Sequence, residues 1–66
     1  MNPEMKNSIR EIKIEHGLRK EIMNQLSTTY PTIKTALLYK SHTSLSDRIR
    51  EYALQHGGIL VESVLL

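Results

Sequence analysis

Three short runs of apolar residues at helical spacing, each closed by residues that break helices, constrain this chain more than any other feature. The runs lie within residues 18–26, 30–39 and 44–56. In each run the apolar side chains recur at intervals of three or four, which places them along one side of a helix. Helices this short are marginal in isolation. The sequence therefore predicts three helices that pack around a shared core.

The junction between the first two runs carries residues typical of a helix start. Ser27, Thr28 and Thr29 favour caps over helix interiors, because their hydroxyls compete for backbone hydrogen bonds. Thr29 is expected to cap the second helix by accepting a bond from one of its free amides. Pro31 falls in the first turn, where its missing N–H costs nothing and its fixed φ is already helical. The second helix is therefore expected to span residues 30–39.

The third run is the best-defined element. Ser44 is expected to cap its start, with the acidic Asp47 near the positive end of the helix dipole. Its amphipathic stripe consists of Leu45, Ile49, Tyr52, Ala53 and His56. Gly57 suits the left-handed position that follows a helix C-cap, so the helix is expected to end there.

The segments that flank the helices favour β-structure. Residues 11–16 alternate Ile12 and Ile14 with charged side chains, the pattern of a half-buried strand, and Gly17 is expected to close this element. Residues 58–64 are apolar on both faces. The two segments are expected to pair as a small antiparallel ribbon. Two readings stay open: the ribbon only covers the helices, or its exposed edge also joins two copies of the chain.

The length and composition limit the rest of the architecture. At 66 residues the chain is expected to form a single domain over residues 1–66, with its core within residues 18–57. The absence of cysteine excludes disulfides and thiolate metal sites, and the absence of Phe and Trp makes the core aliphatic. No run of about 18 apolar residues exists to span a membrane. The opening segment MNPEMKNSIR lacks the apolar centre of a signal peptide, so a cytoplasmic location is expected.

Charge and motifs exclude several classes of function. The formal net charge is +2, but residues 18–50 hold six cations against two acids, whereas residues 51–66 hold two acids and no cation. A polyanion is the partner that such a basic middle segment favours. The three histidines lack the spacing of a metal site. No phosphate-binding glycine loop, carboxylate pair or activated nucleophile is present, so neither an enzyme nor a cofactor is expected.

The first two predicted helices and the turn between them have the layout of a helix-turn-helix unit. In such units the second helix enters the DNA major groove, and its N-terminal residues meet base edges. Here that helix is residues 30–39, with Ile33, Ala36 and Leu37 predicted to be buried. Its outer side carries hydroxyls and a cation but no carboxylate, as a helix lying between phosphates requires.

The outer side of this helix supplies the candidate contact residues. The residues expected to contact bases are Thr29, Tyr30, Pro31, Lys34, Thr35 and Leu38. The residues expected to contact phosphates are Arg19, Lys20, Thr28, Thr32, Lys40 and Arg48. Arg50 stands three residues after Asp47. Two roles for Arg50 are therefore open: an ion pair with Asp47 within the helix, or a contact with a phosphate.

The run RKEIMNQLSTTYPTIKTAL, residues 19–37, resembles the helix-turn-helix of Cro and lambda-type repressors. Residues 18–58 also resemble the lac-repressor type of headpiece, in which a Ser/Thr-rich turn leads into Tyr-x-Thr-[Val/Ile] and a later helix opens with Ser. The resemblance implies that Tyr30, Pro31 and Thr35 read base edges. Pro31 stands where that family has an amide side chain, and Thr35 where it has an arginine. Ser27 stands where the turn usually has glycine.

These features predict a mainly α, three-helix helix-turn-helix domain with a small antiparallel β element formed by the N- and C-terminal segments. The predicted function is sequence-specific binding of double-stranded DNA in transcription regulation, and a homodimer through the β segments would suit a palindromic operator. The alternative is a helix-turn-helix fold used as a protein-interaction or oligomerisation module without DNA binding. The apolar tail Ile59–Leu66 favours it, and it requires an apolar patch around Leu38 and Tyr39. A ribbon-helix-helix protein is disfavoured by the strong third helix.

Overall fold

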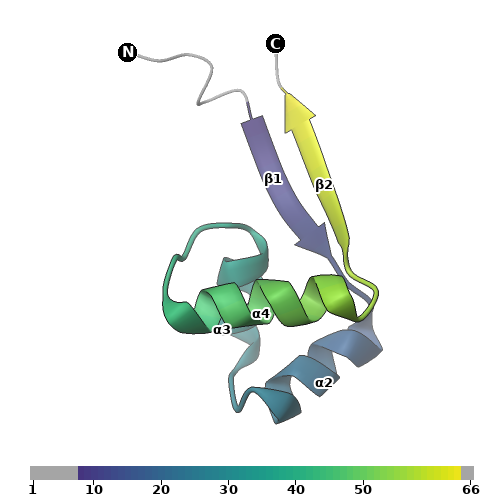
Figure 1. Ribbon diagram of the computed structural model, residues 1–66, viewed down its shortest axis with the longest axis vertical. Helices are drawn as coiled ribbons and strands as arrows, with labels where there is room; N and C mark the ends of the chain where they lie inside the picture. Colours follow the sequence, from purple (N-terminus) through teal and green to yellow (C-terminus); the bar gives the residue numbers. More distant parts are fainter. Residues whose placement is uncertain (1–7, 65–66) are drawn as a thin grey trace.

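The computed structural model describes residues 8–64 as three helices and a two-stranded antiparallel sheet (Figure 1). In chain order the elements are β1 (Ser8–Lys13), α2 (His16–Gln25), α3 (Tyr30–Leu37), α4 (Ser44–Gln55) and β2 (Ile59–Val64). The predicted mainly α fold, with a small antiparallel element built from the two ends of the chain, is confirmed. Residues 65–66, the last of the predicted apolar tail, lie outside the described part.

The two strands pair along their whole length, from Ser8 opposite Val64 to Lys13 opposite Ile59. The first strand lies three residues earlier than the predicted 11–16. The chain leaves the sheet after Lys13, because β2 begins only at Ile59 and offers no further partner. Glu15 then occupies the N-cap position of α2 without a side-chain capping bond, so Gly17 lies inside the helix and does not close the strand. Figure 1 shows the ribbon rising from one end of α4 and projecting beyond the helices.

The helices begin close to the predicted positions, but their caps differ from expectation. Thr29 precedes α3, yet its hydroxyl lies 3.1 Å from that of Thr32 and accepts no bond from a backbone amide. The cap of α4 is Thr43 and not Ser44. The Thr43 Oγ1 accepts a bond of 3.1 Å from the Ser46 amide, which leaves Ser44 as the first helical residue.

Two residues after the last helical residue, each helix is followed by a residue in the left-handed region: Ser27 (φ 50°), Tyr39 (φ 59°) and Gly57 (φ 106°). An amide one residue further on closes each end by bonding back to a carbonyl of the last helical turn. These bonds join Thr28 to Met23 (3.1 Å), Lys40 to Thr35 (3.0 Å) and Gly58 to Ala53 (2.7 Å). The left-handed Gly57 is confirmed. The same geometry at Tyr39 explains why α3 ends at Leu37 and does not reach residue 39.

The core is aliphatic and draws on every helix and on β1. Its buried side chains are Ile12, Ile22, Ile33, Ala36, Leu37, Ile49 and Ala53. The predicted buried side of α3 is therefore confirmed. Ile12 brings β1 into a core expected only within residues 18–57. Between residues 8 and 64, no helix has the length and apolar character needed to cross a membrane.

Arg50 is a buried cation that fixes the connection between α3 and α4. Its Nη1 donates to the carbonyls of Ala36 (2.9 Å) and Ser41 (2.8 Å), and its Nη2 donates to Asp47 Oδ1 (2.6 Å). Its guanidinium also lies 4.9 Å from the centre of the Tyr39 ring. Of the two roles left open for Arg50, the structure shows the pair with Asp47, in a side chain only 10% exposed.

Candidate nucleic-acid interface

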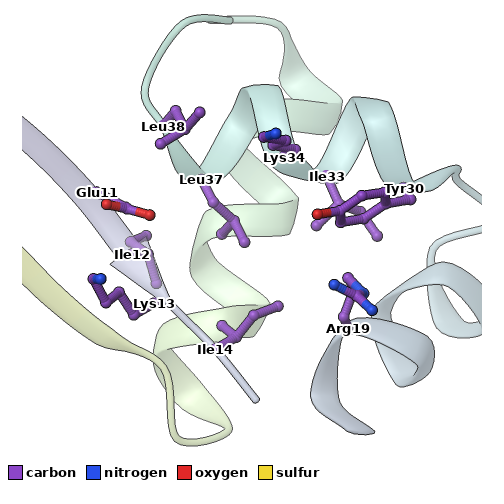
Figure 2. Close-up of a pocket in the computed structure, with 10 residues that line it drawn as sticks. All are labelled: Glu11, Ile12, Lys13, Ile14, Arg19, Tyr30, Ile33, Lys34, Leu37 and Leu38. Atoms are coloured by element: carbon purple, nitrogen blue, oxygen red, sulfur yellow. The ribbon is translucent and has the colours of Figure 1, made fainter. Parts of the chain in front are cut away.

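A hollow of about 290 Å³ lies beside α3, where the helix faces the end of β1 and the start of α2 (Figure 2). We call it the α3 hollow. It is lined by Glu11, Ile12, Lys13, Ile14, Arg19, Tyr30, Ile33, Lys34, Leu37 and Leu38. Its floor is apolar and includes the buried Ile33 and Leu37, whereas charged side chains stand around its rim.

Tyr30 forms one wall of the α3 hollow. As the first residue of α3 it precedes Pro31, which fills the first turn without loss of a backbone bond. Tyr30 is 42% exposed, and the Arg19 guanidinium lies 4.4 Å from the centre of its ring. This distance is within the range of a cation–π contact. The contact joins a cation of α2 to the exposed aromatic side chain of α3, as Figure 2 shows.

The rim of the α3 hollow has an excess of positive charge. Lys13 comes from β1, Arg19 from α2 and Lys34 from α3, and one carboxylate, Glu11 of β1, stands among them. Lys13 and Lys34 are exposed, and Arg19 and Glu11 are half-buried. The outer side of α3 itself carries no carboxylate, as expected. The packing of β1 beside α3 nevertheless brings Glu11 to its border.

Lys13 and Glu11 were not among the predicted contact residues. The only local signal was their place on the polar side of the alternating strand, opposite Ile12. That pattern predicts exposure but not proximity to α3, which depends on tertiary packing.

The threonines of α3 are partly occupied by local bonds. The Thr35 hydroxyl donates to the Pro31 carbonyl at 2.8 Å, and the Thr29 and Thr32 hydroxyls bond each other. A hydroxyl that donates its one hydrogen still has an acceptor lone pair, so Thr35 retains the capacity to accept a bond. Thr35 is half-buried, so part of its surface remains open to a partner.

The structure gathers some predicted contact residues and leaves others apart. Arg19, Tyr30, Lys34 and Leu38 line the α3 hollow together. The remaining predicted contact residues do not line it: Lys20, Thr28, Thr29, Pro31, Thr32, Thr35, Lys40 and Arg48. Lys20, Lys40 and Arg48 are all exposed, in contrast to the buried Arg50.

The phenol of Tyr52 has a raised pKa and lies outside the α3 hollow. Tyr52 donates its phenolic hydrogen to the Glu21 carboxylate, which raises the pKa of Tyr52. Within residues 8–64, no group of three or more His, Asp or Glu side chains gathers in a way that could hold a metal ion.

Comparisons with models of protein families, with curated proteins and with solved structures give no match to this chain.

Proposed function

We propose that this protein binds double-stranded DNA and regulates transcription, with α3 inserted in the major groove. The observation that carries the proposal is the meeting of Tyr30, Arg19, Lys34 and Lys13 around one hollow beside α3. These side chains come from three elements, so the basic, aromatic surface depends on the tertiary fold. Cations around an exposed aromatic side chain suit a surface that neutralises phosphates and touches bases.

The dimensions of α3 are compatible with this placement. An α-helix with its side chains has a diameter of about 10–12 Å, which matches the major-groove width of about 12 Å. Tyr30 and Pro31 at the start of α3 are exposed and would meet base edges first. Thr35 and Leu38 would contribute apolar contacts, and a thymine methyl is their natural target. Such a regulator works where the DNA lies, so a cytoplasmic location belongs to the proposal.

The competing interaction module requires an apolar patch centred on Leu38 and Tyr39. Leu38 is half-buried, and the guanidinium groups of Arg10 and Arg50 lie 5.5 Å and 4.9 Å from the centre of the Tyr39 ring. Tyr39 is therefore half-buried against two guanidinium groups that are paired with Glu62 and Asp47, so it does not form the centre of an exposed apolar patch.

The salt dependence of binding to random-sequence duplex DNA tests the proposal. Neutralisation of three phosphates by Lys13, Arg19 and Lys34 predicts a slope of log K against log salt of about −2.7. Affinity should then fall about 40-fold between roughly 50 mM and 200 mM salt. Fluorescence anisotropy of a labelled duplex measures both quantities.

Substitutions at two exposed residues locate the contact. Lys34→Ala should reduce the magnitude of the slope by about 0.9, whereas Lys34→Arg keeps the charge and should preserve it. Tyr30→Ala should weaken binding with a smaller change in slope, because it removes a neutral side chain. A folded protein that fails to bind at low salt would refute the proposal. Binding with the same slope in Lys34→Ala as in the wild type would place the DNA elsewhere on the surface.

A further inference from the structure

The two edges of the β-ribbon differ in how they are protected. β1 carries three charged residues, Arg10, Glu11 and Lys13, and its end borders the α3 hollow. Charges on an edge strand hinder pairing with another chain. β2 carries a single charged residue, Glu62, in the sequence ILVESV. The edge formed by β1 is thus protected in the way usual for soluble proteins, and the edge formed by β2 is not.

Apolar side chains of β2 are exposed on both faces of the ribbon. Leu60 pairs with Ile12 and shares its face, yet Leu60 is 44% exposed while Ile12 is buried. On the opposite face Ile59 is 66% exposed, and Val61 beside it is half-buried. The sheet packs on α3 and α4 mainly through β1. Within residues 8–64, the outer edge of β2 has no strand beside it.

The charge of Glu62 is already balanced within the ribbon. Its Oε2 accepts a bond of 2.7 Å from Arg10 Nε across the two strands. A second strand that approached the outer edge of β2 would therefore meet an apolar edge with little unbalanced charge. The best complement to such an edge is another apolar, nearly uncharged strand, and β2 itself is a strand of this kind.

We propose that two copies of this chain pair through β2, antiparallel and about a two-fold axis, to form a four-stranded sheet. Antiparallel pairing of identical strands is self-complementary, as a two-fold interface requires. It satisfies the free N–H and C=O groups of both edges and places Ile59, Leu60 and Val61 beside the β2 strand of the second chain. A two-stranded ribbon is marginal alone, and four strands are more stable. This proposal is independent of DNA binding. One six-residue strand per partner makes a small interface, so the dissociation constant is expected to be micromolar.

A charged pair of substitutions tests the edge without disturbing the single chain. Ile59 lies opposite Lys13, and Val61 lies opposite Glu11. In the variant Ile59→Glu with Val61→Lys, each new charge faces an opposite charge within its own ribbon. The net charge is unchanged, but the outer edge of β2 becomes charged. The matched control is Asn24→Glu with Gln25→Lys on the exposed end of α2.

Sedimentation equilibrium over concentrations from low micromolar to millimolar measures the association. The wild type should rise from 7.6 kDa towards twice that mass. The β2 variant should weaken dimerisation about 100-fold, since both copies carry the change and each costs about a factor of ten. The α2 control should dimerise like the wild type. A wild type that stays monomeric at millimolar concentration would overturn the proposal, as would equal association of the β2 variant and the wild type.

An isotope-filtered NMR experiment on a mixture of labelled and unlabelled wild-type chains needs no variant. Intermolecular contacts between backbone protons of two β2 strands are expected. Intermolecular contacts confined to the helices would overturn the proposal even if a dimer forms. The circular dichroism spectrum of the β2 variant at low concentration shows whether its single chain retains the fold.

Discussion

Replacement of Arg50 by alanine should cost more stability than any other change to a charged residue in the described part of the chain. The guanidinium donates to the carbonyls of Ala36 and Ser41 and packs on the Tyr39 ring. A bond from a charged donor contributes about 1.5 kcal/mol, so the two carbonyl bonds contribute about 3 kcal/mol. The pair with Asp47 adds little, because that carboxylate is 71% exposed. We therefore expect Arg50→Ala to lower the free energy of unfolding by about 3 kcal/mol.

A loss of about 3 kcal/mol is a large part of the total free energy of unfolding expected for this chain. A domain of this size has a stability of roughly 3–10 kcal/mol, and each kcal/mol corresponds to about 4–8 °C in the melting temperature. The melting temperature of Arg50→Ala should therefore be roughly 12–24 °C below that of the wild type. Urea and thermal unfolding followed by far-ultraviolet circular dichroism measure both values.

Two matched variants separate the stability contributed by the buried hydrogen bonds of Arg50 from the effect of its charge. Arg48→Ala removes the same charge from an exposed position of α4 and should change stability by less than about 0.5 kcal/mol. Arg50→Lys keeps the charge but lacks the planar fork that reaches both carbonyls, so it should recover less than half of the loss. If Arg50→Ala proved as stable as Arg48→Ala, the assignment of Arg50 as the residue that fixes the α3–α4 connection would be wrong.

Two further predictions concern the end of α4 and its contact with α2. Gly58→Ala should destabilise the fold by about 1–3 kcal/mol in urea unfolding, because an added Cβ would lie 2.7 Å from the Ala53 carbonyl oxygen. Unchanged stability would contradict the close approach of Gly58 to the Ala53 carbonyl oxygen. For Tyr52, the hydrogen bond to Glu21 raises the pKa of the phenol above its ordinary value of 10.0 in the folded state. Stability from this contact is present below pH 10.0 and is lost as pH rises through the folded pKa, since the unfolded chain ionises first. Absorbance titration of tyrosinate should show that Tyr52 ionises late in the wild type and at lower pH in Glu21→Ala, which removes the acceptor. Identical titrations would contradict the contact.

The helices could be predicted because their signals are local. The apolar periodicity and the left-handed Gly57 lie within one element or at its end. The buried side of α3 was predictable for the same reason, since a helix fixes which residues share a side. The caps were less predictable. Thr43 and Ser44 are both good caps, and their φ and ψ angles decide which of them acts.

The end of α3 shows where local reasoning fails. Tyr39 has no intrinsic preference for the left-handed region, in contrast to glycine. It adopts φ 59° with its ring in contact with Arg10 of β1 and Arg50 of α4, which are far apart in the sequence. No periodicity within α3 could have indicated either partner.

Three helices, their approximate limits and the outer residues of α3 could be predicted from the sequence, because they depend on interactions between residues a few positions apart. The two terminal strands were indicated by their local residue pattern, but their pairing joins residues about 50 positions apart. The tertiary structure decided the extent of β1, the burial of Arg50 and the meeting of Lys13 and Glu11 with α3. Each of these depends on contacts between segments distant in the chain. Their physical reason is the packing of β1 against the helices, which places Ile12 in the core and the charged neighbours of Ile12 at the border of the α3 hollow.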